Sequence, residues 1–202
     1  MSFELPLQII LLRIIALLLV GTVHGAVLVG MVTALGDRGP RFEGRLSLNP
    51  LVHAAPLGIV AAVMSMAGWI RPLDIDPTHL RHGRAGLAGA VLVSLIVPII
   101  LFMALLQLRG LTIVYLPPSY SNMINLALRI CAQISIIFAI ANLIPLPPFA
   151  GGYLLQAISQ KLHATVEPRT TIIALVLVAL AILDRGAAFR AVEPFLRTFT
   201  GA

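Results

Sequence analysis

The sequence predicts an all-α fold, a polytopic bundle of about four to six transmembrane segments, because the chain is too apolar to form a water-soluble surface. Of its 202 residues, 59% are hydrophobic and only 11% are charged, whereas a soluble domain averages roughly a quarter charged residues. Each membrane helix needs about 20 apolar residues to cross the hydrocarbon. The chain therefore has no room for a sizeable soluble domain, and we expect a single membrane domain, residues 1–202.

The charges are spread along the chain rather than gathered in one tract. The net charge is +6, from 14 Lys and Arg against 8 Asp and Glu. Dispersed cations are typical of helix ends at lipid headgroups, whereas nucleic-acid binding needs a clustered basic face with aromatic side chains. We expect the partners to be the lipid bilayer and other membrane proteins or transmembrane helices, with no nucleic acid. The expected location is a bacterial inner (cytoplasmic) membrane.

The first apolar run, residues 5–35, contains Arg13 as its only charge and is long enough for a full crossing. Because no small-residue cleavage site follows the run, we interpret it as a retained helix rather than a signal peptide. Turn residues at 36–40 end this helix. A loop or short hairpin is expected from there to Pro50.

The segment 52–70 decides the topology. Its uninterrupted apolar part, 57–70, is 14 residues long, which is short for a crossing and also suits a re-entrant segment. If the segment crosses, the Arg-bearing loops at 38–45 and 71–84 lie on opposite faces of the membrane, and the distribution of cations gives no orientation. The sequence leaves open whether the segment spans or re-enters.

Three further apolar runs are expected to form helices, at residues 86–108, 123–144 and 170–183. A mildly amphipathic tail, residues 187–202, is expected to lie at the membrane interface. The first of these helices should bend at Pro98. Arg129, like Arg13, should meet protein, water or headgroups, because a charge among lipid tails is costly.

Several passages combine His, Asn, Trp, Pro and Gly near the ends of the expected helices. They read Thr22-Val23-His24-Gly25, Asn49-Pro50-Leu51-Val52-His53, Gly68-Trp69-Ile70-Arg71-Pro72, and Asn142-Leu143-Ile144-Pro145 continuing to Ala150-Gly151-Gly152. In order and spacing they resemble the compact branch of the site-2 protease family, intramembrane zinc metalloproteases without PDZ or CBS domains. The resemblance covers about residues 15–160, and matches this long are more specific than a lone short motif. A C-terminal helix and interfacial tail, 165–202, follow this core.

The resemblance implies a zinc site of which this chain keeps only part. The family carries H-E-x-x-H on a membrane helix, where two His four residues apart bind zinc while the Glu activates its water, and an Asp in a Pro-rich turn. Here Gly25 stands in place of the Glu, Leu28 in place of the second His, and Ala150 in place of the Asp. The remaining family-site positions are His24, Asn49, His53, Asn142, Pro145 and Gly151.

Catalysis is not expected, because a catalytic zinc needs about three protein ligands and His24 is the one retained ligand. We expect no catalytic residue, no metal and no other cofactor. The chain is interpreted as a catalytically inactive site-2 protease-like membrane protein that binds other membrane proteins, as a regulator, chaperone or accessory subunit of a membrane complex. Unless it is a ligand, His24 should pair with a polar neighbour such as Asn142.

Two alternatives stay open at this stage. The chain could be an active intramembrane zinc metalloprotease with substituted ligands, using His24 together with His53. It could also be a cofactor-holding membrane subunit, with His24 as the axial ligand of a haem or chlorin.

Overall fold

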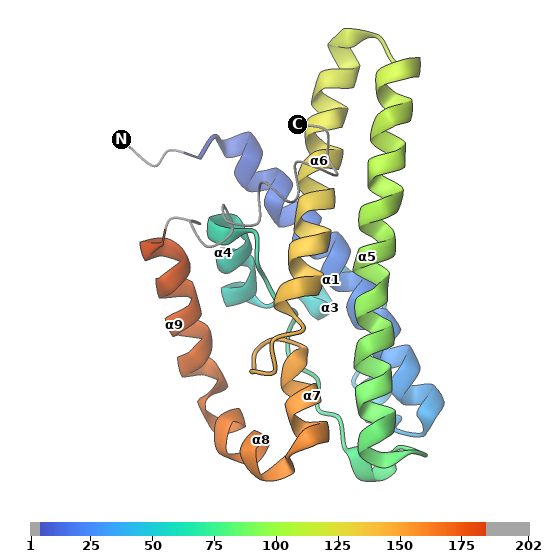
Figure 1. Ribbon diagram of the computed structural model, residues 1–202, viewed down its shortest axis with the longest axis vertical. Coiled ribbons are helices and arrows are strands. Elements are labelled where there is room, and N and C mark those ends of the chain that lie inside the picture. Colours follow the sequence, from blue (N-terminus) through green and yellow to red (C-terminus); the bar gives the residue numbers. More distant parts are fainter. Residues whose placement is uncertain (1–4, 185–202) are drawn as a thin grey trace.

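The computed structural model describes residues 5–184 and confirms the all-α prediction (Figure 1). The helices within this range are α1 Leu7–Leu35, α2 Gly39–Phe42, α3 Pro50–His53, α4 Pro56–Ser65, α5 Gly83–Tyr115, α6 Pro118–Ala141, α7 Gly151–Ile158, α8 Gln160–Val166 and α9 Thr170–Leu183. Short 3-10 turns lie at Pro77–His79 and Glu167–Arg169. Among the described residues, β pairing is limited to an isolated bridge between Ala54 and Ile70.

Within residues 5–184, 4 helical segments are long and apolar enough to cross a membrane, which agrees with the lower end of the predicted range. They are Leu7–Leu35, Gly83–Tyr115, Tyr120–Ala141 and Gln160–Leu183, the last of which joins α8, a 3-10 turn and α9. The final apolar run has the predicted bounds, whereas α6 ends at Ala141 and not at Ile144. The tail predicted at 187–202 lies outside the described residues.

Segment 52–70 folds back along the bundle, and its helix is too short to cross the hydrocarbon. Its helix, α4, has 10 residues and is therefore about 15 Å long, half of the hydrocarbon thickness. After α4 the chain returns to the end of α1, where the amide of Arg81 donates to the carbonyl of Leu35 at 2.8 Å. The amide of Asp76 donates to the carboxylate of Asp37 at 3.1 Å. The two Arg-bearing loops therefore lie at the same end of the bundle.

The loop between α1 and α4 contains two short helices, α2 and α3, and no β-hairpin. Gly36 ends α1 with a φ of 126°, a conformation that glycine adopts without strain. A Cβ at this position would also lie 2.6 Å from the carbonyl oxygen of His79. The turn after α1 is thus shaped by the close approach of the returning chain.

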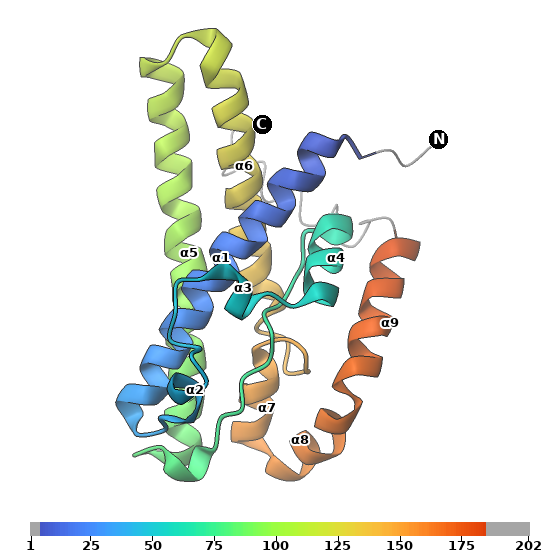
Figure 2. The same ribbon diagram turned by 180° about the vertical axis from the view of Figure 1, so that it is seen from behind.

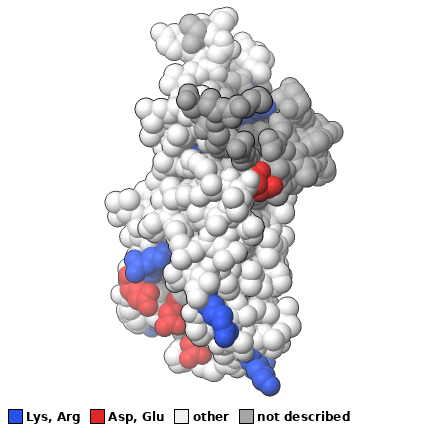
Figure 3. Space-filling model, turned by 90° about the vertical axis from the view of Figure 1, so that its left-hand side faces the viewer, with Lys and Arg blue, Asp and Glu red and all other residues white. Residues whose placement is uncertain are grey.

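Helices α5 and α6 form a long antiparallel hairpin, and α1 crosses both of them (Figures 1 and 2). Helix α5 has 33 residues and continues through Pro98, so it is longer at both ends than the predicted 86–108 span. Helix α9 stands at the opposite side and packs on α4 (Figure 2). On the face that Figure 3 shows, the charged side chains gather toward the lower end, where α8 lies.

Arg13 meets protein, as predicted. Arg13 lies in the N-terminal half of α1, and its guanidinium donates to the carbonyl of Val63 in α4. The re-entrant helix thereby supplies a polar partner for a cation that the first membrane helix carries, and removes the cost of facing lipid tails.

Candidate functional site

His24 lies in the middle of α1 and is fully buried, with 0% of its surface exposed. Its Nδ1 lies 3.1 Å from the carbonyl oxygen of Ser94 in α5. Because a carbonyl only accepts, Nδ1 carries the proton and Nε2 presents its lone pair. The ring meets Phe138 of α6 edge-on, with centroids 5.2 Å apart, and Nε2 has no hydrogen-bond partner.

His24 has a polar partner, as expected, but this partner is the Ser94 carbonyl and not Asn142. The Asn142 amide nitrogen donates to the carbonyls of Gly68, at 3.0 Å, and Phe138, at 2.9 Å, and its oxygen accepts from the amide of Ala150 at 3.0 Å. Asn142 thereby joins the end of α6 to the loop at Gly68 and to Ala150, where the Pro-rich turn ends. The backbone of α5 was the available acceptor for His24, and a sequence pattern does not reveal a backbone partner 70 residues away.

His53 fills the space beside Gly25. Its Nε2 donates to the carbonyl of Ser47 at 2.8 Å, while Nδ1 is buried without a partner and faces α1. A Cβ built on Gly25 would lie 2.3 Å from this Nδ1. The imidazole therefore occupies the room that a side chain at position 25 would need, which is the position of the glutamate in the family that the chain resembles.

The surroundings of His53 disfavour its charged form. Burial lowers its pKa below the usual value, the nearby Arg45 guanidinium lowers it further, and the hydrogen bond to the Ser47 carbonyl opposes them. The two histidines thus each direct one N–H at a backbone carbonyl and keep one unpartnered ring nitrogen. His24 is the chain neighbour of Gly25, and the His53 ring lies beside the same glycine.

Leu28 and Ala150, the other two substituted positions, lie in one hydrophobic cluster. Both side chains are buried, and the cluster includes Leu87 and Val91 of α5. The fold therefore brings positions 28 and 150 into the same region, as the spacing of the resembling motifs implies. Their side chains make this region apolar.

The Pro-rich turn is shaped by backbone contact. A Cβ at Gly151 would lie 2.0 Å from the carbonyl oxygen of Ile144, so only glycine fits there. Pro145 is exposed at the outer side of the turn. Asn49 is exposed as well, and its side chain caps α3 by accepting from the amide of Leu51 at 3.0 Å. The structure thus gives Gly151 and Asn49 local structural roles.

Two residues that the sequence analysis did not select fix the loops around the site. The guanidinium of Arg45 is buried and donates to the carbonyls of Val52 and Arg71. The hydroxyl of Tyr153 donates to the carbonyl of Leu73 at 2.9 Å and accepts from its amide. Arg45 lies four residues before the Asn49-Pro50 passage, so its position close to a motif was a usable signal, whereas nothing local distinguishes Tyr153.

The side chains at this site do not fit a catalytic zinc. Across residues 5–184, no group of three or more His, Cys, Asp or Glu is placed to hold a metal ion. His24 and His53 supply two ring nitrogens, and the rest of the site is hydrocarbon, backbone or amide. A catalytic zinc needs about three protein ligands and one open position, so we derive no catalytic step from this site.

Comparison with known proteins found one clear similarity. The chain is 27% identical over 160 residues to a protein named "Putative zinc metalloprotease YwhC" of Bacillus subtilis (strain 168), across 75% of this chain and 70% of that protein. No family model matches the chain, and no solved structure matches it. The chain is therefore a membrane-type helical protein similar to a protein named as a zinc metalloprotease.

Proposed function

We propose that this chain is a zinc-free relative of membrane metalloproteases that binds other membrane proteins and does not cleave them. Its role is that of a regulator, a chaperone or an accessory subunit of a membrane complex. The observation that carries the proposal is the contact between His53 and Gly25, because it fills the place of a general base with an imidazole.

Hydrolysis by the usual zinc route needs a metal-bound water and a base that accepts its proton. In this chain the position of the base cannot accept even a methyl group without movement of His53. Two of the three ligand positions are Leu28 and Ala150, which pack in an apolar cluster. A divalent ion at this place would be buried without a carboxylate to balance its charge, which is costly.

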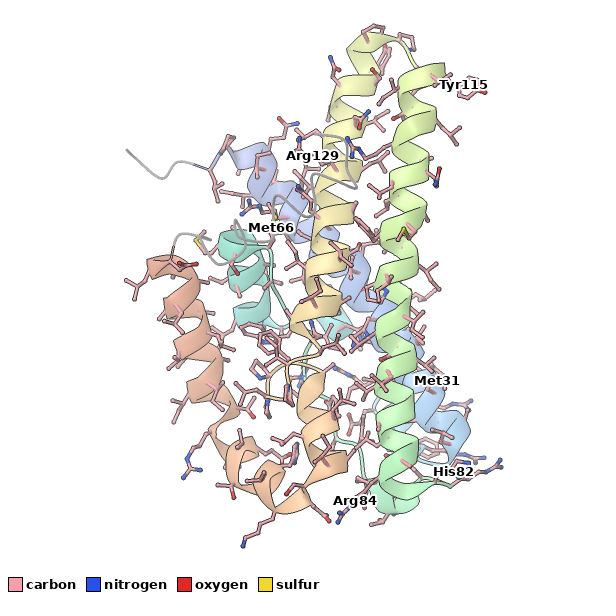
Figure 4. The ribbon with its side chains drawn as sticks, in the orientation of Figure 1. Met31, Met66, His82, Arg84, Tyr115 and Arg129 are labelled. Carbon is pink, nitrogen blue, oxygen red and sulfur yellow. The ribbon has the colours of Figure 1, made fainter. Side chains whose placement is uncertain are left out.

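The surface that we assign to a partner is the tip of the α5–α6 hairpin, residues 110–124. Arg84 and Arg109 lie 25 residues apart on α5, which corresponds to about 38 Å, close to the thickness of a bilayer with its headgroups. Arg109 donates to the side chain of Asn125 on α6 at 2.7 Å. Arg129 lies one turn further along α6, below the tip, and Tyr115 lies at the tip (Figure 4).

The tip is strongly apolar although it lies beyond Arg109 and Arg129. The sequence has no charged residue between Arg109 and Arg129. Val114 is 73% exposed and Tyr115 76% exposed, and other large apolar side chains of the tip are exposed beside them, namely Leu111, Ile113, Tyr120 and Met123. An apolar surface placed past the headgroups is covered when another protein binds it. We therefore expect an apolar surface on the extramembrane part of a membrane protein as the partner.

The experiment compares two charged variants in the native membrane. Complexes are cross-linked, solubilised and purified through a tag on the chain, and co-purifying membrane proteins are quantified by mass spectrometry. Val114→Glu in the tip should lose its partner. Phe42→Glu, at an exposed aromatic residue of α2, is the matched control and should keep it. Equal recovery of every membrane protein with both variants would refute the assignment of the tip.

A second candidate function is supported by the unpartnered ring nitrogens of His24 and His53. Two neutral imidazoles can bind a transition metal when a third ligand comes from a partner chain or substrate. This is the substituted-ligand metalloprotease. Incubation of the purified chain with a fluorogenic membrane-helix substrate, with and without added zinc, distinguishes it. Zinc-dependent cleavage that His24→Ala abolishes would favour this candidate over the first.

In a cofactor-holding role, the same residue, His24, would be the axial ligand of a haem or chlorin. The absorption spectrum of the purified protein tests it, because a haem or chlorin absorbs visible light.

The proposed location is a bacterial inner membrane, and the proposed orientation follows from the re-entrant segment. Because this segment returns to the end of α1, both Arg-bearing loops, 38–45 and 71–84, lie at one end of the bundle. Cytoplasmic loops carry an excess of Lys and Arg. We propose that this end faces the cytoplasm, and labelling of a cysteine introduced at Arg41 from either side of the membrane tests the orientation.

A further inference from the structure

A cavity of about 400 Å³ lies between α4, α9 and the end of α6. Its lining is apolar and includes Ala61, Trp69, Ala141, Phe149, Leu177 and Ala181. Helix α9 contacts α4 and stands apart from the α5–α6 hairpin (Figure 1). An empty cavity destabilises a protein in proportion to its volume, so an apolar occupant would stabilise this fold.

We propose that this cavity holds one acyl chain of a membrane phospholipid. An apolar cavity of about 150 Å³ binds benzene, so about 25 Å³ per carbon atom gives 400 Å³ room for about 16 carbon atoms. That number matches one acyl chain. A membrane-spanning helix is about 10–12 Å wide and about 30 Å long, and is far too large for this space.

The charges around the cavity favour a phospholipid over a free fatty acid. Among residues 5–184, the one charged side chain that lines the cavity is that of Asp184, directly after the end of α9. Its carboxylate would repel the carboxylate of a fatty acid drawn in with its chain. A phospholipid keeps its headgroup outside the apolar cavity and inserts only its tail.

Trp69 reports directly on the occupant. It is the only tryptophan of the chain, it lines the cavity, and its surface is only 4% exposed. Its ring stands edge-on to Phe149, with centroids 5.5 Å apart. A lipid tail must enter the cavity to lie against this indole, because the ring is otherwise enclosed. This inference is independent of the proposed function.

The test is quenching of Trp69 fluorescence by bromine. The full chain is reconstituted in phosphatidylcholine vesicles whose acyl chains are brominated, and its emission is compared with that in unbrominated vesicles. We expect the emission to fall by half or more. Ala181→Phe fills part of the cavity and should reduce this quenching at least twofold. Ile182→Phe is the control on the same helix, because Ile182 does not line the cavity and is 50% exposed.

Three results would overturn the proposal. Wild-type emission could be unaffected by the brominated phospholipid, or Ala181→Phe could be quenched as much as Ile182→Phe. Quenching could also occur with a brominated fatty acid in unbrominated vesicles and not with the brominated phospholipid. If Ala181→Phe fails to fold, which circular dichroism would show, the smaller change Ala181→Leu takes its place and should reduce quenching in the same direction.

Discussion

Adding one methyl group to Gly25 tests how completely His53 closes the site. In a helix interior, replacing Gly by Ala normally stabilises by about 1 kcal/mol. Here the added Cβ would lie 2.3 Å from Nδ1 and 2.8 Å from Cε1 of His53. Overpacking of this kind costs about 1–3 kcal/mol. The two effects oppose each other, so Gly25→Ala should destabilise the chain by up to about 2 kcal/mol.

The same substitution should change sign once His53 is shortened. In a His53→Ala background the overlap is absent, so Gly25→Ala should recover its stabilising effect of about 1 kcal/mol. The coupling energy between the two positions is then about 1–3 kcal/mol. Gly30→Ala is the control on the same helix, because its Cβ would lie 3.9 Å from the nearest atom of Leu46, an ordinary contact.

The assay is reversible unfolding of the four Gly25 and His53 variants in mixed micelles, followed by circular dichroism. The steric account requires opposite signs for Gly25→Ala in the two backgrounds, with Gly30→Ala stabilising in both. If Gly25→Ala is as favourable as Gly30→Ala in the presence of His53, the imidazole does not fill this space and the reasoning fails.

Three further predictions concern the site and its supports. The triple change Gly25→Glu, Leu28→His and Ala150→Asp should restore a zinc site only when His53→Ala is added. Elemental analysis of this quadruple variant should then find about one zinc per chain. Zinc binding by the triple variant with His53 intact would contradict this prediction, because it would show that the His53 ring moves aside for a side chain at position 25. Asn142→Leu should lower the free energy of unfolding by about 2–5 kcal/mol, because it leaves buried groups of Gly68 and Ala150 unpaired; a loss below 1 kcal/mol in micelles contradicts this. The melting temperature should fall as the pH is lowered from about 7.5 to 5. The pKa of His53 is lower in the folded chain than in the unfolded chain, so the unfolded chain takes up the proton at a higher pH and is favoured as the pH falls. His53→Gln should flatten this dependence, and an unchanged slope would assign it to other groups.

The membrane helices could be predicted from the sequence because their signal is local. A run of apolar residues long enough to cross the hydrocarbon has few alternatives in a chain with so little charge. The final run shows this well, since α9 has the predicted bounds of 170 and 183. The continuation of α5 past residue 108 was missed because Arg109 interrupts the run, and in the structure Arg109 is accommodated by Asn125 of α6.

The fate of segment 52–70 could not be predicted, because its length suits both a short crossing and a re-entrant helix. What decides between them is long-range pairing, such as that of Arg81 with Leu35 and of Asp76 with Asp37. Hydrogen bonds between residues about 40 positions apart leave no periodic mark on either segment. The orientation stayed open for the same reason.

The sequence indicated which residues of the candidate site to compare, but not the contacts that they make. The spacing of the motifs indicated that positions 28 and 150 belong together, and both lie in one cluster. The partner of His24 is a carbonyl of α5, and the neighbour of Gly25 is a ring from α3. Both are consequences of how the helices pack, which substitution patterns in one sequence do not report.

The zinc content of the wild-type chain, purified from native membranes without chelators and measured by elemental analysis, tests the central claim most directly. The account predicts far less than one zinc per chain, since Leu28 and Ala150 stand at two ligand positions and His53 closes on Gly25. About one zinc per chain that His24→Ala removes would contradict it.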